Sequence, residues 1–195
     1  MSDSLRSPSI GDFDLGRTIG KGTFSTVRIA KNKSTNAIWA VKVLKKIEIM
    51  NSKQTDRCIQ ERNLLANLAH PFIVSLAHTF QDKKCLYFIY EYISGGEFLT
   101  YFNQSGSLDE NHIQFYSVQI ALVFKYLHST ETIYRDLRPE NILINKKGYM
   151  KLINFSIAKR FTYKTYTICG TPEYIAPEML LYNGYGHEID WWTFG

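Results

Sequence analysis

Long apolar runs are missing from this chain of 195 residues. No stretch approaches the roughly 18 consecutive apolar residues that a membrane-spanning helix needs, so we expect no membrane partner. The opening residues MSDSLRSPSI lack the hydrophobic core of a signal peptide, and Ser2 stands where N-myristoylation needs glycine. We therefore expect residues 1–12 to form a flexible arm.

Cysteine is scarce as well. The three cysteines, Cys58, Cys85 and Cys169, have no paired spacing, which excludes a disulfide-stapled secreted domain. Reduced thiols are typical of the cytoplasm, which we take as the expected location, together with the nucleus as a second one. The sequence also lacks internal repeats and low-complexity tracts.

Charge is not concentrated in blocks. The net charge is +5, but lysine and arginine are spread along the chain, so a basic protein that binds nucleic acid is the weakest hypothesis and we expect no nucleic acid partner. Hydrophobic residues make up 45% and charged residues 21% of the chain, which are ordinary values for a globular protein.

A glycine-rich string is the first motif that carries chemistry. GKGTFSTV, from Gly20 to Val27, lies between two apolar runs and predicts a strand, a tight turn and a second strand. Glycines let backbone N–H groups approach phosphates closely, although such turns are common and weak evidence alone. The next apolar run, AIWAVKVL, carries Lys42, which would ordinarily face solvent but stands where a phosphate-binding lysine is expected.

Two predicted helices follow. Residues 56–68 place Ile59, Leu64, Leu65 and Leu68 on one side and also carry Glu61. This glutamate is either a solvated helix charge or the ion-pair partner of Lys42.

The second predicted helix spans residues 109–128, with Ile113, Tyr116, Ile120, Phe124 and Leu127 at helical spacing. It leads into YRDLRPEN, which carries Asp136 and Asn141. The runs KLINFSIAK, APE and DWW come next in the chain.

Taken in this order, the motifs resemble those of serine/threonine protein kinases of the cAMP-dependent type. YISGGEF, TYTICGTPEYIAPEM and IDWWTFG resemble the same family, and the resemblance runs from about Phe13 to Gly195. It implies an α+β, two-lobed fold with an antiparallel-sheet small lobe that carries one long helix, and a helical large lobe. The implied parts are the small lobe over 13–90, a hinge over 91–96 and a partial large lobe over 97–195. A kinase domain of this family has about 250 to 300 residues, so we expect the large lobe to be incomplete.

The resemblance also implies a site that takes ATP and Mg²⁺. Asp136 would be the catalytic base, Lys42 paired with Glu61 would contact phosphates, Arg138 would contact the transferred phosphate, and Asn141 with the residue at position 154 would hold metal. The implied nucleotide-binding residues are Ile19, Gly20, Lys21, Gly22, Thr23, Phe24, Ser25, Thr26, Val27, Ala40, Lys42, Tyr90, Glu91, Ile93, Glu97 and Leu143.

The resemblance also implies residues for substrate recognition and for regulation by phosphorylation. The family's substrates have basic residues before the target, which Glu97 and Glu140 would read, while Ile168, Pro172 and Ile175 would line an apolar slot. Thr167 matches the activation-segment phosphosite, with Arg57, Arg135 and Lys159 as basic partners. The implied partners are protein substrates, an upstream activating kinase and a regulatory subunit.

Four residues depart from the family pattern. Asn154 stands where the family has the metal-binding aspartate of Asp-Phe-Gly, and a neutral amide should bind Mg²⁺ less well than a carboxylate. Ser156 replaces the glycine of that motif, Arg138 replaces a lysine, and Ser25 replaces the third glycine of the loop. The sequence therefore predicts a kinase with weak or absent activity, or alternatively an inactive pseudokinase that binds nucleotide or a protein.

Overall fold

The computed structural model describes residues 8–195 and separates the chain into two compact units. The first unit holds the chain up to Asp56 together with Ser75–Tyr92, and the second holds Arg57–Val74 and Ile93–Gly195. The division at Tyr92 lies within the predicted hinge, while the predicted boundaries themselves remain predictions. Residues 1–7 of the predicted arm lie outside the described part, and residues 8–12 include a 3₁₀ helix at Ile10–Asp12.

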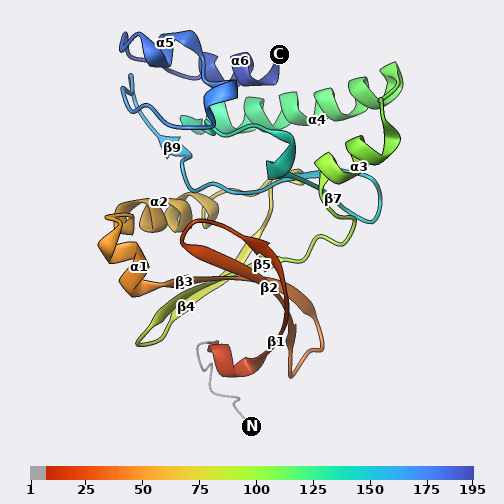
Figure 1. Ribbon diagram of the computed structural model, residues 1–195, viewed down its shortest axis with the longest axis vertical. Helices are drawn as coiled ribbons and strands as arrows, with labels where there is room; N and C mark the ends of the chain where they lie inside the picture. Colours follow the sequence, from red (N-terminus) through yellow and green to blue (C-terminus); the bar gives the residue numbers. More distant parts are fainter. Residues whose placement is uncertain (1–7) are drawn as a thin grey trace. The chain divides into compact units, whose positions relative to one another are not determined.

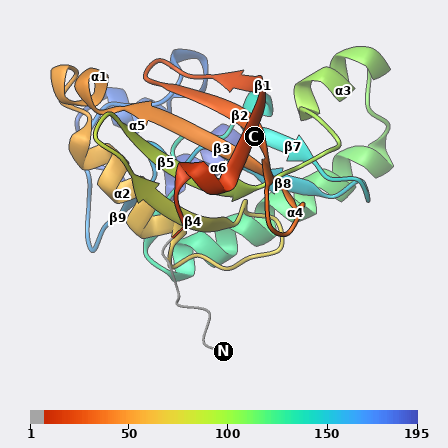
Figure 2. The same ribbon diagram turned by 90° about the horizontal axis from the view of Figure 1, so that it is seen from below.

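A five-stranded antiparallel sheet forms the first unit, in the order β1-β2-β3-β5-β4 (Figures 1 and 2). Its strands are β1 (Phe13–Lys21), β2 (Ser25–Asn32), β3 (Ile38–Lys45), β4 (Leu76–Gln81) and β5 (Cys85–Glu91), and the short helix α1 (Lys46–Asn51) follows β3. One face of the sheet is a hydrophobic core made of Phe13, Ala30, Val41, Tyr87 and Ile89. Alternate residues on β2, β3 and β5 therefore point to the opposite face.

Helices dominate the second unit. They are α2 (Thr55–Leu65), whose first two residues fall in the first unit, α3 (Phe98–Ser105), α4 (Glu110–Ser129), α5 (Pro177–Leu180) and α6 (Glu188–Phe194). Two-stranded ladders join β6 (Thr132–Ile133) to β9 (Lys159–Arg160) and β7 (Ile142–Ile144) to β8 (Met150–Leu152). Short 3₁₀ helices occupy Pro139–Asn141 and Pro172–Tyr174. The antiparallel sheet and the helical second unit confirm the α+β class.

Two predicted helices are present, with some differences in their buried faces. In α2, Cys58, Glu61, Leu64 and Leu65 are buried, whereas Ile59 is half exposed, so its place on the apolar side was wrong. In α4 the predicted residues Tyr116, Phe124 and Leu127 are buried, while 54% of Ile113 is exposed. The Asp109 side chain caps α4 by accepting from the His112 N–H at 2.8 Å. No helix in residues 8–195 is long and apolar enough to cross a membrane.

A buried carboxylate connects three segments of the second unit. Asp190 of α6 is fully buried and accepts hydrogen bonds from the backbone N–H groups of Tyr134 at 3.0 Å and Arg135 at 2.8 Å. His128 Nε2, at the end of α4, lies 2.8 Å from the same carboxylate. Because Tyr134 and Arg135 directly precede Asp136, this carboxylate sets the backbone of the loop that carries the predicted base.

We expect Asp190→Ala to lower the free energy of unfolding by about 3 kcal/mol or more, because two buried N–H donors lose their acceptor. Glu188→Ala is the matched control, since this exposed acid of the same helix accepts one hydrogen bond from the Gly186 N–H. Its expected loss is about 1 kcal/mol or less. Urea unfolding of both variants measures the difference, and equal losses would contradict a special role for Asp190.

Candidate active site

The loop after β6 brings Asp136 and Asn141 together. The Asn141 amide donates to the backbone carbonyl of Asp136 at 2.7 Å and to its Oδ2 at 2.8 Å. Both side chains are largely buried, with exposed fractions of 10% for the Asp136 side chain and 4% for Asn141. The 3₁₀ helix Pro139–Asn141 reverses the chain so that Asn141 faces back toward Asp136. The two residues predicted for the catalytic loop thus share one site.

Asn154 joins them from the end of β8, where it adopts a left-handed backbone with φ of 61°. Its Nδ2 donates to Asp136 Oδ2 at 3.0 Å and lies 3.2 Å from Asn141 Oδ1, which also accepts from it. The Ser156 hydroxyl donates to Asn154 Oδ1 at 2.9 Å and fixes which way the amide faces. The N–H₂ group of Asn154 therefore points at the oxygens of the other two residues.

This donor arrangement does not fit Mg²⁺. A magnesium ion needs oxygen atoms directed at it, preferably from carboxylates. Here Asp136 Oδ2 and Asn141 Oδ1 both accept from the Asn154 amide, and the remaining oxygen of Asn154 accepts from Ser156. Among residues 8–195, no group of three His, Cys, Asp or Glu side chains is placed to hold a metal ion.

Burial raises the pKa of Asp136 above the ordinary value for aspartate, although the hydrogen bond from Asn141 and the charge of Arg138 oppose this. Arg138 Nε lies 3.7 Å from Asp136 Oδ1, and its NH1 lies 3.9 Å from Glu140 Oε1. These separations are too long for hydrogen bonds, and Arg138 Nε is a buried donor that has no acceptor among residues 8–195. Arg138 thus contributes positive charge near Asp136 without a fixed bidentate contact.

The predicted phosphate-binding lysine shares a sheet face with predicted nucleotide-binding residues. Lys42 pairs with Val27 on β2, and Ala40 pairs with Tyr90 on β5. Because side chains at alternate positions and at paired positions lie on the same side, these four residues lie on the face opposite the hydrophobic core.

The glycine-rich turn completes this part of the first unit. Gly22 donates its N–H to the Ser25 carbonyl at 2.9 Å, and Gly20 pairs with Val27. A Cβ added at Gly22 would lie 2.8 Å from Ser25 Oγ, so a larger residue would require the serine to move. The remaining predicted residues of this string, Ile19, Lys21, Thr23, Phe24 and Thr26, lie on β1, the turn or β2.

The other predicted nucleotide-site residues lie in the second unit, except Glu91. Glu61 is 3% exposed on α2, and Ile93 is 8% exposed. Leu143 lies on β7, where it forms an isolated bridge with Glu97. Glu91, the last residue of β5 in the first unit, accepts from the Ser75 N–H at 2.8 Å. The pairing of Lys42 with Glu61 and a nucleotide position shared by the two units stay predictions.

The activation segment holds Thr167 exposed next to buried anchors. Arg135 donates from Nε to the Ile157 carbonyl at 2.8 Å and from NH1 to the Tyr185 hydroxyl at 3.0 Å. That hydroxyl in turn donates to the backbone carbonyl of Thr167. The Lys159 ammonium donates to Thr165 Oγ1 at 3.3 Å. Two of the three predicted basic partners thus lie beside the segment.

The third predicted partner, Arg57, is exposed on α2 and makes no hydrogen bond or ion pair within the described residues. Among the predicted substrate-reading residues, Glu97 and Glu140 are exposed, as is Ile168. Ile175 instead packs against the core cluster of Ile133, Ala176, Met179, Tyr185 and Ile189. The assignment of these residues to substrate or phosphate stays a prediction.

Comparison with known proteins decides the family. Residues 13–195 match the family model described as protein kinase domain. The chain belongs to the protein kinase family.

Its similarity extends to cAMP-dependent kinases. The human "cAMP-dependent protein kinase catalytic subunit PRKX" is 40% identical over 187 residues, which cover 96% of this chain and 52% of that protein. The yeast "cAMP-dependent protein kinase type 3" from Saccharomyces cerevisiae is 40% identical over 193 residues, 99% of this chain and 48% of that protein. "cAMP-dependent protein kinase catalytic subunit 3" from Drosophila melanogaster is 38% identical over 98% of this chain and 33% of that protein. The kinase domain described here therefore spans between about a third and a half of the length of these relatives.

The sequence analysis assigned no role to two anchors of this kinase domain, although one of them, Asp190, begins the DWW run. Tyr185 is 1% exposed and links Arg135 to Thr167, and Asp190 holds the backbone before Asp136. The available signals were weak. Tyr185 stands between Gly184 and Gly186 in a polar stretch, and Asp190 is the acid of a short apolar helix.

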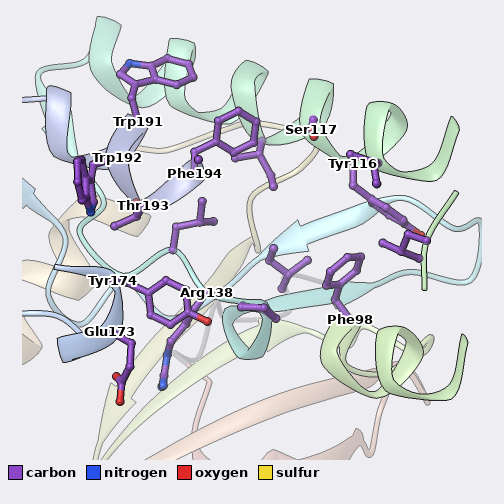
Figure 3. Close-up of a pocket in the computed structure, with 17 residues that line it drawn as sticks. Phe98, Tyr116, Ser117, Arg138, Glu173, Tyr174, Trp191, Trp192, Thr193 and Phe194 are labelled. Atoms are coloured by element: carbon purple, nitrogen blue, oxygen red, sulfur yellow. The ribbon is translucent and has the colours of Figure 1, made fainter. Parts of the chain in front are cut away.

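A cavity of the second unit is lined by residues that directly follow Asp136 but not by Asp136 itself. Figure 3 shows its lining, with Trp191, Trp192 and Phe194 from α6, Tyr116 from α4 and Arg138 from the catalytic loop. Its volume is about 790 Å³ and most of the lining is apolar. With few polar groups, this cavity offers little to chemistry on phosphate.

Phosphate placed on Thr167 is expected to draw on Arg135, Lys159 and Arg57 through roughly one to three charge-assisted hydrogen bonds. Because these contacts need no metal, hydrogen exchange over residues 161–177 should slow, by roughly tenfold for one such bond. Exchange of phosphorylated protein is compared with that of Thr167→Ala, with unphosphorylated protein as control. Equal exchange in the phosphorylated protein and the variant would show that the basic side chains do not act on the phosphate.

Proposed function

We propose that this kinase domain is a binding module of the cAMP-dependent type that transfers phosphate weakly or not at all. The observation that supports this is the direction of the Asn154 amide, whose N–H group donates to Asp136 and Asn141. Protein kinases in general use ATP with Mg²⁺, and the aspartate at this position normally coordinates the ion. An N–H donor in its place opposes a cation both by its partial positive charge and by occupying the neighbouring oxygens.

The Asn154 amide also affects the predicted base, because it donates to the Asp136 carboxylate. As a base it has to accept a proton from a hydroxyl group, and its Oδ2 already accepts two amide hydrogen bonds. Its raised pKa would favour proton acceptance, but a proton-accepting oxygen also needs access to the substrate. Side-chain amides therefore occupy one of the two carboxylate oxygens, Oδ2, which leaves Oδ1 as the oxygen that a hydroxyl group could approach.

Binding of nucleotide and protein is the role that remains. Lys42, Val27, Ala40 and Tyr90 share one sheet face, as an adenine nucleotide site on the first unit requires. The exposed acids Glu97 and Glu140 offer negative charge to a segment with basic residues. We propose proteins of this kind as partners, with a regulatory subunit among them, and a cytoplasmic location that suits the free thiols of Cys58, Cys85 and Cys169.

A second candidate is a serine/threonine kinase of low activity that acts on targets preceded by basic residues. The observation that favours it is that Asp136, Asn141 and Arg138 remain together in the catalytic loop. The two candidates differ in whether any phosphate is transferred.

We expect ATP to stabilise the protein with little added effect of Mg²⁺, because the Asn154 amide occupies the oxygens that the ion would need. Thermal unfolding with ATP, in the presence of Mg²⁺ or of EDTA, measures this. The control is Asn154→Asp, in which Mg²⁺ should add stabilisation. A large extra shift with Mg²⁺ in the unchanged protein would overturn the proposal, and absence of any shift with ATP would remove the nucleotide-binding part of it.

Asn154→Asp alone is expected to leave phosphorylation of an arginine-rich serine peptide low, because Arg138 cannot act as the compact point charge of a lysine. Asn154→Asp combined with Arg138→Lys should be faster than the single variant by at least roughly tenfold, the scale of effects of residues around a metal site. Incorporation of phosphate into the peptide is the readout, and Lys42→Met in the double variant is the control for contaminating kinases. Robust turnover by the unchanged protein would instead favour the second candidate.

A further inference from the structure

A second pocket, away from Asp136, lies between α2 and the β6–β9 ladder of the second unit. Its volume is about 300 Å³. The side chains of Gln60 and Asn63 line it from α2, that of Asn67 lines it from the segment after α2, and those of Lys159 and Arg160 line it from β9. Of these lining residues, only Lys159 has a predicted role elsewhere, as a partner of phosphate on Thr167, so the other polar groups of the pocket have to be explained on their own.

Positive charge is the first feature of this α2–β9 pocket. Lys159 and Arg160 both line it, and none of its lining residues is acidic. Arg160 is exposed and makes no hydrogen bond or ion pair in the part of the chain that the structure describes. Its guanidinium is a planar fork that suits two oxygens of one anion.

Neutral donors are the second feature. Gln60 and Asn63 are three positions apart on α2, so they lie on the same side of the helix. Their side-chain amides make no hydrogen bond within residues 8–195, which leaves their N–H₂ groups available. Asn67, one turn further on, already donates to the Asn63 carbonyl at 2.7 Å.

The hydroxyl groups on the other walls of the pocket already donate hydrogen bonds to the protein. The Thr130 hydroxyl donates to the Leu127 carbonyl at 2.8 Å, and the Thr132 hydroxyl donates to the Thr130 carbonyl at 3.3 Å. Leu64 and Leu68 add apolar surface. The side chains of the pocket without a hydrogen bond inside residues 8–195 are therefore one guanidinium and two amides, all exposed to solvent, and their N–H groups suit an anion with several acceptor oxygens.

We propose that the α2–β9 pocket binds a small phosphate monoester, with Arg160 holding the phosphate and the amides of Gln60 and Asn63 completing its hydrogen bonds. The volume exceeds that of phosphate alone and admits a small organic group against Leu64 and Leu68. Lys159 adds positive charge to the pocket. Because the same ammonium group donates to Thr165, Lys159 would connect the bound ligand to the activation segment. This site is independent of the proposed nucleotide site.

The test is a titration of the whole chain with inorganic phosphate, O-phosphoserine or serine, at constant ionic strength set with chloride. Side-chain amide resonances of Gln60 and Asn63 are followed by nuclear magnetic resonance. We expect saturable shifts with both phosphate compounds, tighter binding of phosphoserine than of inorganic phosphate, and no saturation with serine. Absence of saturation with the phosphate compounds, or the same shifts with chloride alone, would overturn the proposal.

Variants separate this pocket from general attraction of anions to a basic protein. Arg160→Gln is expected to weaken phosphoserine binding by roughly tenfold, the value of one charge-assisted hydrogen bond. Lys125→Gln, which removes an exposed charge of α4 outside the pocket, should leave binding unchanged. Asn63→Ala should weaken binding without any change in net charge, and it serves as the test if Arg160→Gln does not fold. Equal weakening by Arg160→Gln and Lys125→Gln, or no effect of Asn63→Ala, would contradict the assignment.

Discussion

The buried carboxylate of Asp190 determines the geometry on which the candidate site depends. It accepts from two consecutive backbone N–H groups, at Tyr134 and Arg135, directly before the predicted base. Arg135 has a left-handed backbone with φ of 69°, an unfavourable conformation for a residue with a side chain, and the acceptor offsets part of that cost. The same residue then presents its guanidinium to Tyr185. One acid of α6 thus positions both the catalytic loop and the anchor of the activation segment.

In the candidate site, an N–H₂ group at position 154 replaces a carboxylate oxygen, so this position donates hydrogen bonds where an aspartate would accept them. An aspartate after β8 would offer only acceptors to its surroundings, whereas Asn154 offers a donor group to Asp136 and Asn141. The backbone does not need to change, because asparagine tolerates the left-handed conformation at φ of 61°. Phe155 beside it remains fully buried against Tyr134, with ring centroids 5.1 Å apart. The kinase fold is therefore preserved around a site whose central interaction is a hydrogen bond between side chains.

The family and the α+β class could be predicted from the sequence, and so could the proximity of Asp136, Asn141 and Asn154, because the motifs are local. Asp136 and Asn141 are five residues apart in one loop, and Asn154 follows a ladder that starts at the end of that loop. The direction of the Asn154 amide could not be predicted, because it depends on the Ser156 hydroxyl and on both acceptors at once. The exposure of Ile59 was mispredicted because helical spacing alone does not say which neighbours cover a face.

The hydroxyl of Ser156 makes the effect of Asn154 depend on a second position of the chain. This hydroxyl holds the amide oxygen and so turns the nitrogen toward Asp136. With glycine at 156, the amide oxygen would lose its hydrogen-bond donor, while the N–H₂ group would still be held by Asp136 and Asn141. The two positions are therefore coupled, and the effect of one replacement depends on which residue occupies the other. Asn154→Asp should therefore change the site differently when residue 156 is serine than when it is glycine, because only serine has a hydroxyl that donates to the side chain at 154.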